Sequence, residues 1–205
     1  EEANSIKEFA RTSHKVVTVD YIMRYNPLIF AIKELYETGV FGRLRHVSVE
    51  NYAQDEWLAP EHWFWDRKVS GGVLVEHGVH FIDLVNYLTD QKVQKVQGLS
   101  FRRNPLQEDQ MMATVLYDKG LMASHYHSFA RPGFFEDTSI KFNFDITQIE
   151  LKGWIPLKGK VTVLVNKETK AQLKNLPNLQ VKNIQKIKDI HDISRPGGWG
   201  ETKRQ

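Results

Sequence analysis

With 205 residues, 41% of them hydrophobic, the chain is long enough to form one large domain with a real core. Its net charge of +3 is too small to indicate nucleic-acid binding without a clustered basic patch, and the lack of cysteine excludes disulfides, thiolate catalysis and cysteine-based zinc sites. The lack of cysteine also fits a cytoplasmic protein. No apolar run reaches membrane-spanning length, which predicts no membrane contact.

The sequence opens with a helix pattern followed by a short strand pattern. Ile6, Phe9 and Ala10 form an apolar stripe within residues 1–13, and β-branched residues predict a strand over residues 15–20. Neither an initiator Met nor a signal-peptide pattern stands at the start. A helix and a strand without an opening strand indicate the tail of a unit that begins earlier in a longer protein.

A second helix and an aromatic loop follow. Pro27 keeps Asn26 out of the α region and fits the first turn of a helix, which ends before Thr38–Gly42. A strand is expected over residues 44–50. The next segment, residues 51–68, is a loop that contains Trp57, Trp63 and Trp65. Exposed tryptophans are costly, so this loop covers a cleft or a subunit contact, or packs on its own core.

The most informative stretch runs from Ser70 to Asp90. Its apolar periodicity predicts one helix with Ser70 as the N-cap. On such a helix Glu76 and His80 share one face, with Cβ atoms roughly 6 Å apart. A carboxylate beside an imidazole orients the ring for proton transfer, and the pair Gly71–Gly72 lets a backbone or a flat ligand approach closely. The alternative is a polar patch with a histidine that belongs to the core.

From residue 93 onward the pattern has period two, which predicts consecutive strands over residues 93–101, 111–118, 121–128, 139–149 and 161–165. Asp118–Gly120 is typical of a hairpin turn. The strand over 121–128 places His125 and His127 on one sheet face, followed by Arg131. These side chains either contact a substrate or form a polar sheet face, and the polar face is favoured.

The fold class expected from this order is α+β, with an open, mainly antiparallel sheet and helices on one face. The lysine-rich residues 166–190 predict a solvated helix or an edge extension, with nucleic-acid contact as a weak alternative. Residues 195–200 predict a flexible loop.

Four stretches in order resemble the glucose–fructose oxidoreductase/inositol dehydrogenase (Gfo/Idh/MocA) family. Residues 17–27 resemble its strand followed by Arg-aromatic-x-Pro, and residues 39–44 resemble its G-x-[IF]-G turn. Residues 65–72 resemble its W-x-x-x-x-x-G-G segment, and residues 76–83 resemble its D-x-G-x-H-x-x-D helix. The resemblance extends over about residues 1–165 and rests on the order and spacing of these motifs.

The resemblance implies a Rossmann domain that binds NAD or NADP, of which residues 1–20 would be the last helix and strand. Residues 21–205 would form the substrate-binding and oligomerisation domain, with a dihydrodipicolinate-reductase-like fold. No G-x-G-x-x-G follows a strand, and the family's cofactor-contacting lysine would lie upstream of Glu1. The open sheet face would join a homo-oligomer, either a dimer or a tetramer.

The resemblance also assigns roles to single residues. His80 falls on the family's general acid/base, and Glu76 stands where the family usually has Asp. Arg24 matches the family arginine, which contacts substrate or braces the domain junction. His77 matches no family position. The remaining expected contacts are Trp65, Arg67 and His127 with the small-molecule substrate, and Gly71 and Gly72 with the cofactor.

The expected activity is hydride transfer between nicotinamide and the carbinol carbon of a sugar, polyol or related hydroxy or carbonyl compound. His80 would accept the hydroxyl proton while Glu76 orients the ring. One alternative is a non-catalytic oligomerisation or regulatory member of the same fold. Another is metal-dependent hydrolysis that uses Glu76, His77 and His80 with His125 or His127.

Overall fold

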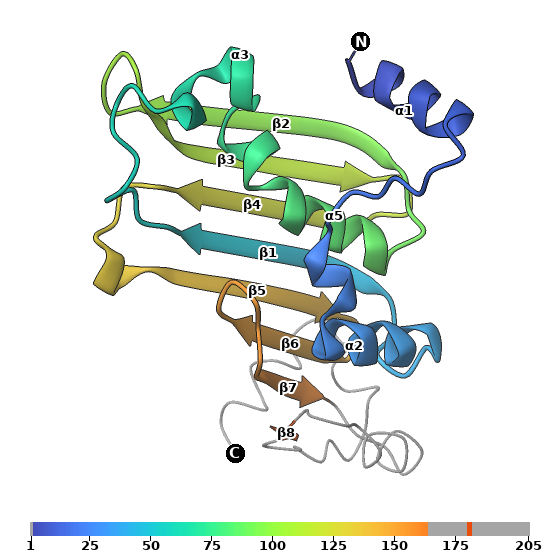
Figure 1. Cartoon of the computed structure of the whole chain (residues 1–205). Helices are drawn as coiled ribbons and strands as arrows, with labels where there is room; N and C mark the ends of the chain where they lie inside the picture. The colour runs from blue at the N-terminus through green and yellow to red at the C-terminus, as the bar shows by residue number, and fades with distance from the viewer. Residues whose placement is uncertain (1, 164–179, 182–205) are drawn as a thin grey trace.

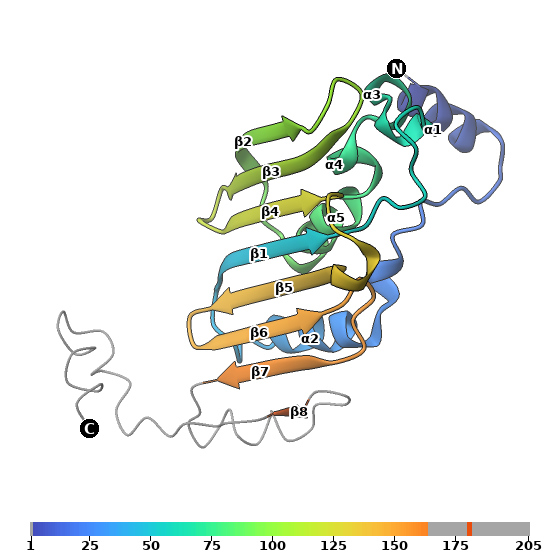
Figure 2. The same ribbon diagram turned by 90° about the vertical axis from the view of Figure 1, so that its left-hand side faces the viewer.

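The computed structural model of the chain describes residues 2–163 and 180–181. One open sheet with strand order β2-β3-β4-β1-β5-β6-β7-β8 forms its centre, and the helices lie on one face (Figures 1 and 2). Neighbouring strands are antiparallel except for the parallel pairs β1–β4 and β7–β8. The expected α+β class with an open, mainly antiparallel sheet is confirmed. The strands are β1 Leu44–Tyr52, β2 Val93–Arg102, β3 Glu108–Tyr117, β4 Met122–Ser128, β5 Asp137–Phe144, β6 Thr147–Lys152, β7 Gly159–Val163 and β8 Gln180–Val181.

The helical elements are short, and two of them, α2 and α5, cover the sheet. Asn26 is extended and its side chain accepts a hydrogen bond from Leu28 N at 2.9 Å, so α2 begins at Pro27 as predicted. None of the described helices has both the length and the apolar character of a membrane span. The helices are α1 Glu2–Thr12, η1 Ile22–Tyr25, α2 Pro27–Glu37, η2 Trp63–Trp65, α3 Arg67–Ser70, α4 Val73–Glu76, α5 Val79–Leu88 and η3 Gly133–Phe135.

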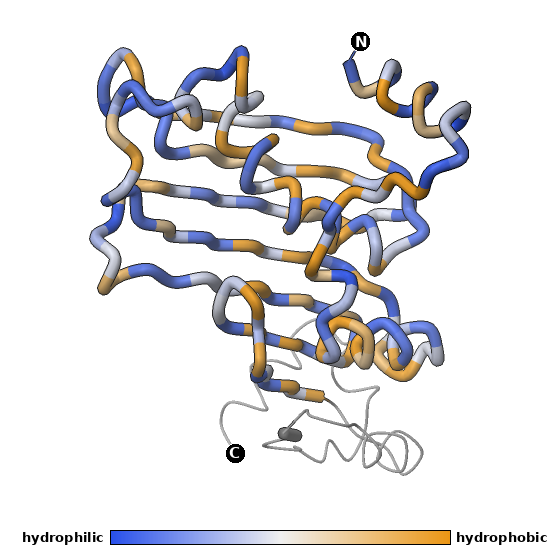
Figure 3. The backbone as a smooth tube through the Cα atoms, in the orientation of Figure 1, coloured by the Kyte–Doolittle hydropathy of each residue, from blue (hydrophilic) through white to orange (hydrophobic). Residues whose placement is uncertain are grey.

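The main core lies between the sheet and the helices α2 and α5. Ile32 and Leu84 from the helices and Val47, Ile140 and Phe142 from the strands are fully buried there. Hydrophilic and hydrophobic residues alternate along the central strands (Figure 3). The hydrophobic side chains face the helices, and the opposite face of the sheet carries no described helix. A second, smaller core cluster consists of Ala53, Phe64, Trp65, Val73 and Phe129.

The predicted strand over residues 15–20 is wrong. These residues have no regular secondary structure, and Val16 is 97% exposed. A β-branched segment becomes a strand only when a neighbouring strand pairs with it, and the described chain offers none at this place. The preceding helix α1 forms as expected but buries none of its residues.

The predicted single strand over residues 139–149 is two strands, β5 and β6, joined by a turn at Asp145. The Asp145 carboxylate accepts hydrogen bonds from Arg43 N at 2.8 Å and from Arg45 Nε at 2.6 Å. These bonds to the start of β1 and the residue before it hold the turn, and the period-two pattern does not predict them. The predictions for residues 166–190 and 195–200 lie outside the described residues, apart from the two that form β8.

The predicted helix from Ser70 is also wrong, because the glycine pair interrupts it. Gly71 and Gly72 have φ angles of 79° and 90°, which end α3 and start α4 anew. Ser70 is the last residue of α3, and its hydroxyl accepts a hydrogen bond from Gly72 N at 2.9 Å. Asp66 caps α3 instead, because its side chain accepts a hydrogen bond from Lys68 N.

We expect Gly71→Ala to lower the free energy of unfolding by about 1 to 3 kcal/mol, because the residue keeps a positive φ and its new Cβ would lie 2.6 Å from Val75 Cγ1. Urea unfolding of the chain measures this change. Gly98→Ala is the matched control, since its Cβ would meet only Met112 O at 3.5 Å. Equal effects of both substitutions would contradict the account of the break.

Candidate active site

A second interruption, between α4 and α5, turns His77 toward the sheet. Val73 O accepts hydrogen bonds from both His77 N at 3.0 Å and Gly78 N at 2.9 Å, so the turn widens at this point. A Cβ on Gly78 would lie 3.0 Å from Leu74 Cα, so any larger residue would require the backbone of Leu74 to shift. The ring of His77 therefore reaches β1, where Nε2 lies 2.9 Å from Asn51 Oδ1.

Asn51 anchors this contact from within the sheet. It is 1% exposed, pairs in register with His127 on β4 and Thr138 on β5, and donates from Nδ2 to Thr138 Oγ1 at 2.8 Å. With the amide in this orientation, Asn51 Oδ1 is an acceptor, so the hydrogen of neutral His77 sits on Nε2. The Nδ1 atom of His77 then keeps its lone pair.

His125 and His127 lie beside this contact, under the helices. They share one sheet face as predicted, with ring centroids 6.3 Å apart and nearly parallel planes. The favoured interpretation of a polar sheet face is wrong, because both side chains are 0% exposed. Their ring nitrogens have no hydrogen-bond partner among the described residues. Unpartnered buried polar atoms are costly and are typical of sites with a function beyond packing.

Burial keeps these imidazoles neutral. Desolvation lowers the pKa of His125 to about 4. It lowers the pKa of His77 to about 4, with a smaller contribution from the charge of His80, and that of His127 to about 3, with contributions from His77 and His125. At neutral pH the three rings are therefore uncharged.

His80 differs from these three because it lies at the edge of the cluster. Its ring contacts Trp154 edge-to-face at a centroid distance of 5.5 Å and Tyr21 at 6.4 Å. The Nδ1 atom is buried without a partner, whereas Nε2 is not sealed from solvent. The nitrogen available for proton exchange is therefore Nε2.

Glu76 does not orient His80 by a hydrogen bond in the described structure. The two residues were expected on one face of a single helix, but they belong to α4 and α5 on either side of the widened turn. Glu76 makes no hydrogen bond or ion pair with any described residue and remains partly exposed. The carboxylate is therefore available to a partner, and its role stays a prediction.

Arg24 braces two elements. Its guanidinium donates to the 8%-exposed side chain of Asp83 on α5, from Nε at 2.8 Å and from the terminal nitrogen at 2.5 Å. It also lies over the rings of Tyr21 at 5.0 Å and Tyr87 at 5.5 Å. This bidentate pair joins η1 to α5 within the one predicted domain, so a role of Arg24 at a domain junction stays a prediction. Contact between Arg24 and a substrate stays a prediction.

The expected cofactor contacts, Gly71 and Gly72, lie in the turn between α3 and α4. Gly72 is buried, α4 spans only four residues, and the positive φ angles of the two glycines are explained by the turn alone. Contact of Gly71 and Gly72 with a cofactor therefore stays a prediction. The described part of the chain contains no group of three or more histidine and acidic side chains that could hold a metal, so metal-dependent hydrolysis has no ligand set here.

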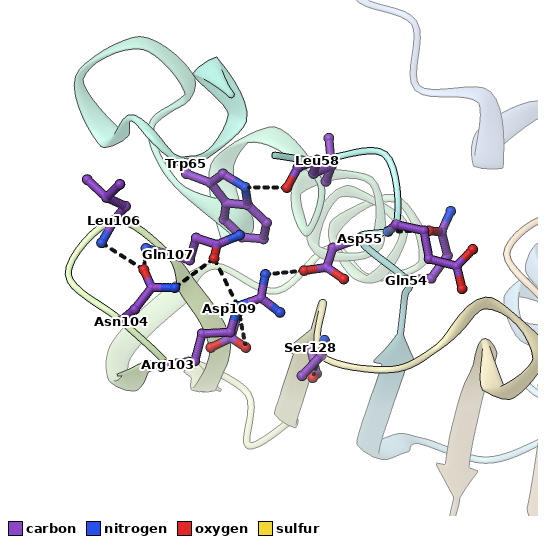
Figure 4. Close-up of polar contacts among 12 residues, drawn as sticks. Gln54, Asp55, Leu58, Trp65, Arg103, Asn104, Leu106, Gln107, Asp109 and Ser128 are labelled. Atoms are coloured by element: carbon purple, nitrogen blue, oxygen red, sulfur yellow. Dashed lines mark hydrogen bonds and ion pairs between the residues drawn. The ribbon is translucent and has the colours of Figure 1, made fainter. Parts of the chain in front are cut away.

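Of the loop residues expected at the substrate, Trp65 belongs to the smaller core cluster and is 8% exposed. Its indole donates to Leu58 O at 3.2 Å (Figure 4). This outcome matches the interpretation of a loop packed on its own core, although Trp57 is 83% exposed. Arg67 is exposed on α3.

A network around Arg103 holds the same loop (Figure 4). Arg103 pairs with Asp55, donates from Nε to Gln107 at 3.2 Å, and lies 5.5 Å over the ring of Trp65. Its Nε is also 3.8 Å from the carboxylate of Asp109, which is 1% exposed. The network thus ties residues 53–66 to the β2–β3 hairpin and fixes the entry to α3.

Two open hollows lie away from the histidine cluster. One of about 600 Å³ is lined by Arg24, Tyr25, Phe30 and Tyr87, and one of about 470 Å³ lies on the helix-free face at Leu99 and Met112. Neither of these two hollows is lined by a histidine.

Sequence reasoning missed Asn51 and Trp154 as members of the site, and it named His77 only as a candidate metal ligand. Asn51 and Thr138 lie in phase with the inward-facing residues of their strands, which was an available signal for buried polar groups. Trp154 comes from the loop between β6 and β7, far along the chain from His77, and no local pattern indicates that contact.

A model of the GFO/IDH/MocA C-terminal domain family matches residues 29–145, more than half of the chain. Glucose-fructose oxidoreductase domain-containing protein 1 of Mus musculus is 33% identical over 78 residues, which cover 38% of this chain and 20% of that protein. The scyllo-inositol 2-dehydrogenase (NAD(+)) of Bacillus subtilis (strain 168) is 22% identical over 126 residues, covering 58% of this chain and 35% of that enzyme.

Among solved structures, an inositol dehydrogenase homolog from Azotobacter vinelandii, complexed with NADH and myo-inositol, matches with a TM-score of 0.61. Its sequence is 22% identical, and the match covers 73% of this chain and 40% of that one. At this identity the likeness shows the fold. The chain spans less than half the length of each of these three proteins.

Because His77, His125 and His127 are buried in the neutral form, we expect the free energy of unfolding to fall at acid pH. In the unfolded chain a histidine gains its proton near pH 6.5, whereas His125 in the fold stays neutral down to about pH 4. The unfolded state binds more protons in this window, so stability is lost as the pH falls, by up to about 1.4 kcal/mol per pH unit for each such histidine.

We expect His125→Leu to reduce that slope by up to about 1.4 kcal/mol per pH unit while the free energy of unfolding at pH 7.5 falls little or rises, because no hydrogen bond is lost. Urea unfolding at pH 5 and pH 7.5 measures both quantities. An unchanged slope in the variant would show that His125 does not contribute.

Proposed function

The chain belongs to the GFO/IDH/MocA family, and on this premise we propose that it supplies the substrate-holding and acid–base half of a nicotinamide-dependent oxidoreductase. The proposed substrate is a sugar, a polyol or a related hydroxy or carbonyl compound. The NAD(+) named for the Bacillus enzyme and the NADH and myo-inositol named for the Azotobacter homolog support this class. The cofactor of this protein is proposed to be NAD or NADP.

The observation that carries the proposal is the placement of His80. Its Nε2 is accessible, its Nδ1 is buried, and its ring is set against Trp154 and Tyr21. A general base needs one nitrogen within reach of the substrate and a ring held by its surroundings. His125 and His127 are fully buried and the Nε2 of His77 is held by Asn51, so His80 is the histidine of the cluster with no ring nitrogen already engaged that also has an accessible one.

The chain's part in the reaction is movement of a proton. In the oxidation direction His80 Nε2 takes the proton of the substrate hydroxyl as its carbon–oxygen bond becomes a carbonyl, and it returns the proton in the reverse direction. When bound, the nicotinamide takes or gives the hydride. Glu76 is proposed to orient the ring of His80 when the substrate is bound.

The helix-free sheet face is proposed to join copies of the chain. Leu99 is 77% exposed, Phe101 58%, and Met112 and Met122 46% and 48%. An apolar face of this kind in a folded domain is typical of an interaction surface. A dimer or tetramer built on this face is the proposed assembly. A purely structural role is the second candidate function, and the missing hydrogen bond between Glu76 and His80 favours it.

Substitution of His80 separates the two functions. In the full-length protein, His80→Ala is expected to lower turnover about 10²- to 10⁴-fold, because the acid–base group is lost. Dinucleotide affinity should stay nearly unchanged. Steady-state kinetics and a fluorescence titration with NADH measure these quantities. Lys119→Ala, at the exposed turn between β3 and β4, is the control and should leave both unchanged.

Retention of full turnover by His80→Ala would assign the acid–base step to another residue. Loss of turnover together with dinucleotide affinity would indicate a structural effect. Either result would contradict the proposed role of His80.

A further inference from the structure

The loop between β6 and β7, residues 153–158, folds back on the helix-covered side of the sheet (Figures 1 and 2). It is held at two points. Gly153 N donates to Thr138 O at 2.8 Å, and Asn26 Nδ2 donates to Pro156 O at 2.9 Å. Asn26 is 5% exposed, so the second contact is part of the packed interior. The loop therefore presents Trp154 from a fixed position.

Trp154 contacts both histidines of the α4–α5 junction. Its indole stacks on His77 at a centroid distance of 4.5 Å and an angle of 21°, and it meets His80 edge-to-face at 5.5 Å. It also meets Phe81 at 5.0 Å. Since Asn51 holds His77 from the other side, the indole rests on a rigid support.

Packing within the fold leaves part of the Trp154 indole free to contact a ligand. Trp154 is half-buried, and its Nε1–H donates no hydrogen bond to any described residue, although the atom is not sealed from solvent. Trp65 shows the contrast, because its indole N–H donates to Leu58 O and its ring is buried. An aromatic ring with an open edge and a free donor, beside an accessible imidazole nitrogen, suits a ligand that combines an apolar face with hydroxyl groups.

We propose that Trp154 makes the site prefer ring-shaped substrates over acyclic ones. The indole forms the wall beside His80 Nε2 against which the C–H face of a six-membered ring polyol or pyranose packs, while a ring hydroxyl points at His80. An acyclic polyol has no such rigid face and gains less from this wall. The inference rests on the proposed function, to which it adds a specificity-determining residue.

The experiment compares kcat/KM of the full-length protein for myo-inositol and D-glucose, which are ring compounds, with that for sorbitol, which is acyclic. Each is measured with NAD and with NADP. Trp154→Ala is expected to lower kcat/KM for the ring compounds about 10- to 100-fold, mainly through KM, and that for sorbitol less than about threefold. Trp154→Phe keeps a ring of smaller area and is expected to recover most of the loss. Trp57→Ala, which removes an 83%-exposed tryptophan, is the matched control and should change neither value.

The outcomes distinguish the inference from the proposed function. If wild type oxidises the ring compounds and both Trp154 variants keep the wild-type ratio of ring to acyclic kcat/KM, the inference is overturned and the proposed function stands. Equal loss on both compound classes in the folded Trp154→Phe variant would reduce Trp154 to a structural role and overturn it as well. If wild type oxidises none of the compounds, the proposed substrate class fails, and the inference fails with it.

Discussion

The hydrogen bond between His77 and Asn51 is the contact on which the arrangement of the site depends. It joins the junction of α4 and α5 to the middle of the sheet and lies beside the buried His127. The widened turn at Gly78 makes this contact possible, because a continuous helix would not direct His77 at β1 in this way. Trp154 then covers His77 and borders His80. The break between α4 and α5 thus leaves His77 hydrogen-bonded to Asn51 and His80 with an accessible Nε2.

This arrangement has a cost that the rest of the fold offsets. Four ring nitrogens of His125 and His127 are buried without described partners, and each such atom costs about 1 to 3 kcal/mol. The large apolar core on the α2 and α5 side of the sheet supplies the compensating burial. The Arg24–Asp83 pair and the Arg103 network hold the elements on either side of the cluster. Such polar groups inside a core are expected where chemistry, rather than stability, sets the sequence.

Local patterns predicted most of the elements. The period-two segments became strands, and the Asn26–Pro27 signal placed the start of α2, because these patterns report burial and backbone preference within a few residues. The resemblance identified the family and pointed to His80. The patterns failed where residues far apart in the sequence determine the structure. The turn at Asp145 is held by a hydrogen bond from Arg43 N, and residues 15–20 lack a described strand to pair with. The position of His77 depends on the break at Gly78, and that of Trp154 depends on the β6–β7 loop. A helical pattern of apolar residues predicts neither feature.

As proposed above, this chain supplies the proton-transferring half of a nicotinamide-dependent enzyme, and the other half holds most of the dinucleotide. Fluorescence titration of NADH and NADPH tests this proposal most directly, in two samples: the 205-residue chain, and a longer form that carries its native upstream sequence. The account predicts saturable binding of one dinucleotide to the longer form and none to the 205-residue chain. Equal binding to both forms, or binding to neither, would contradict it.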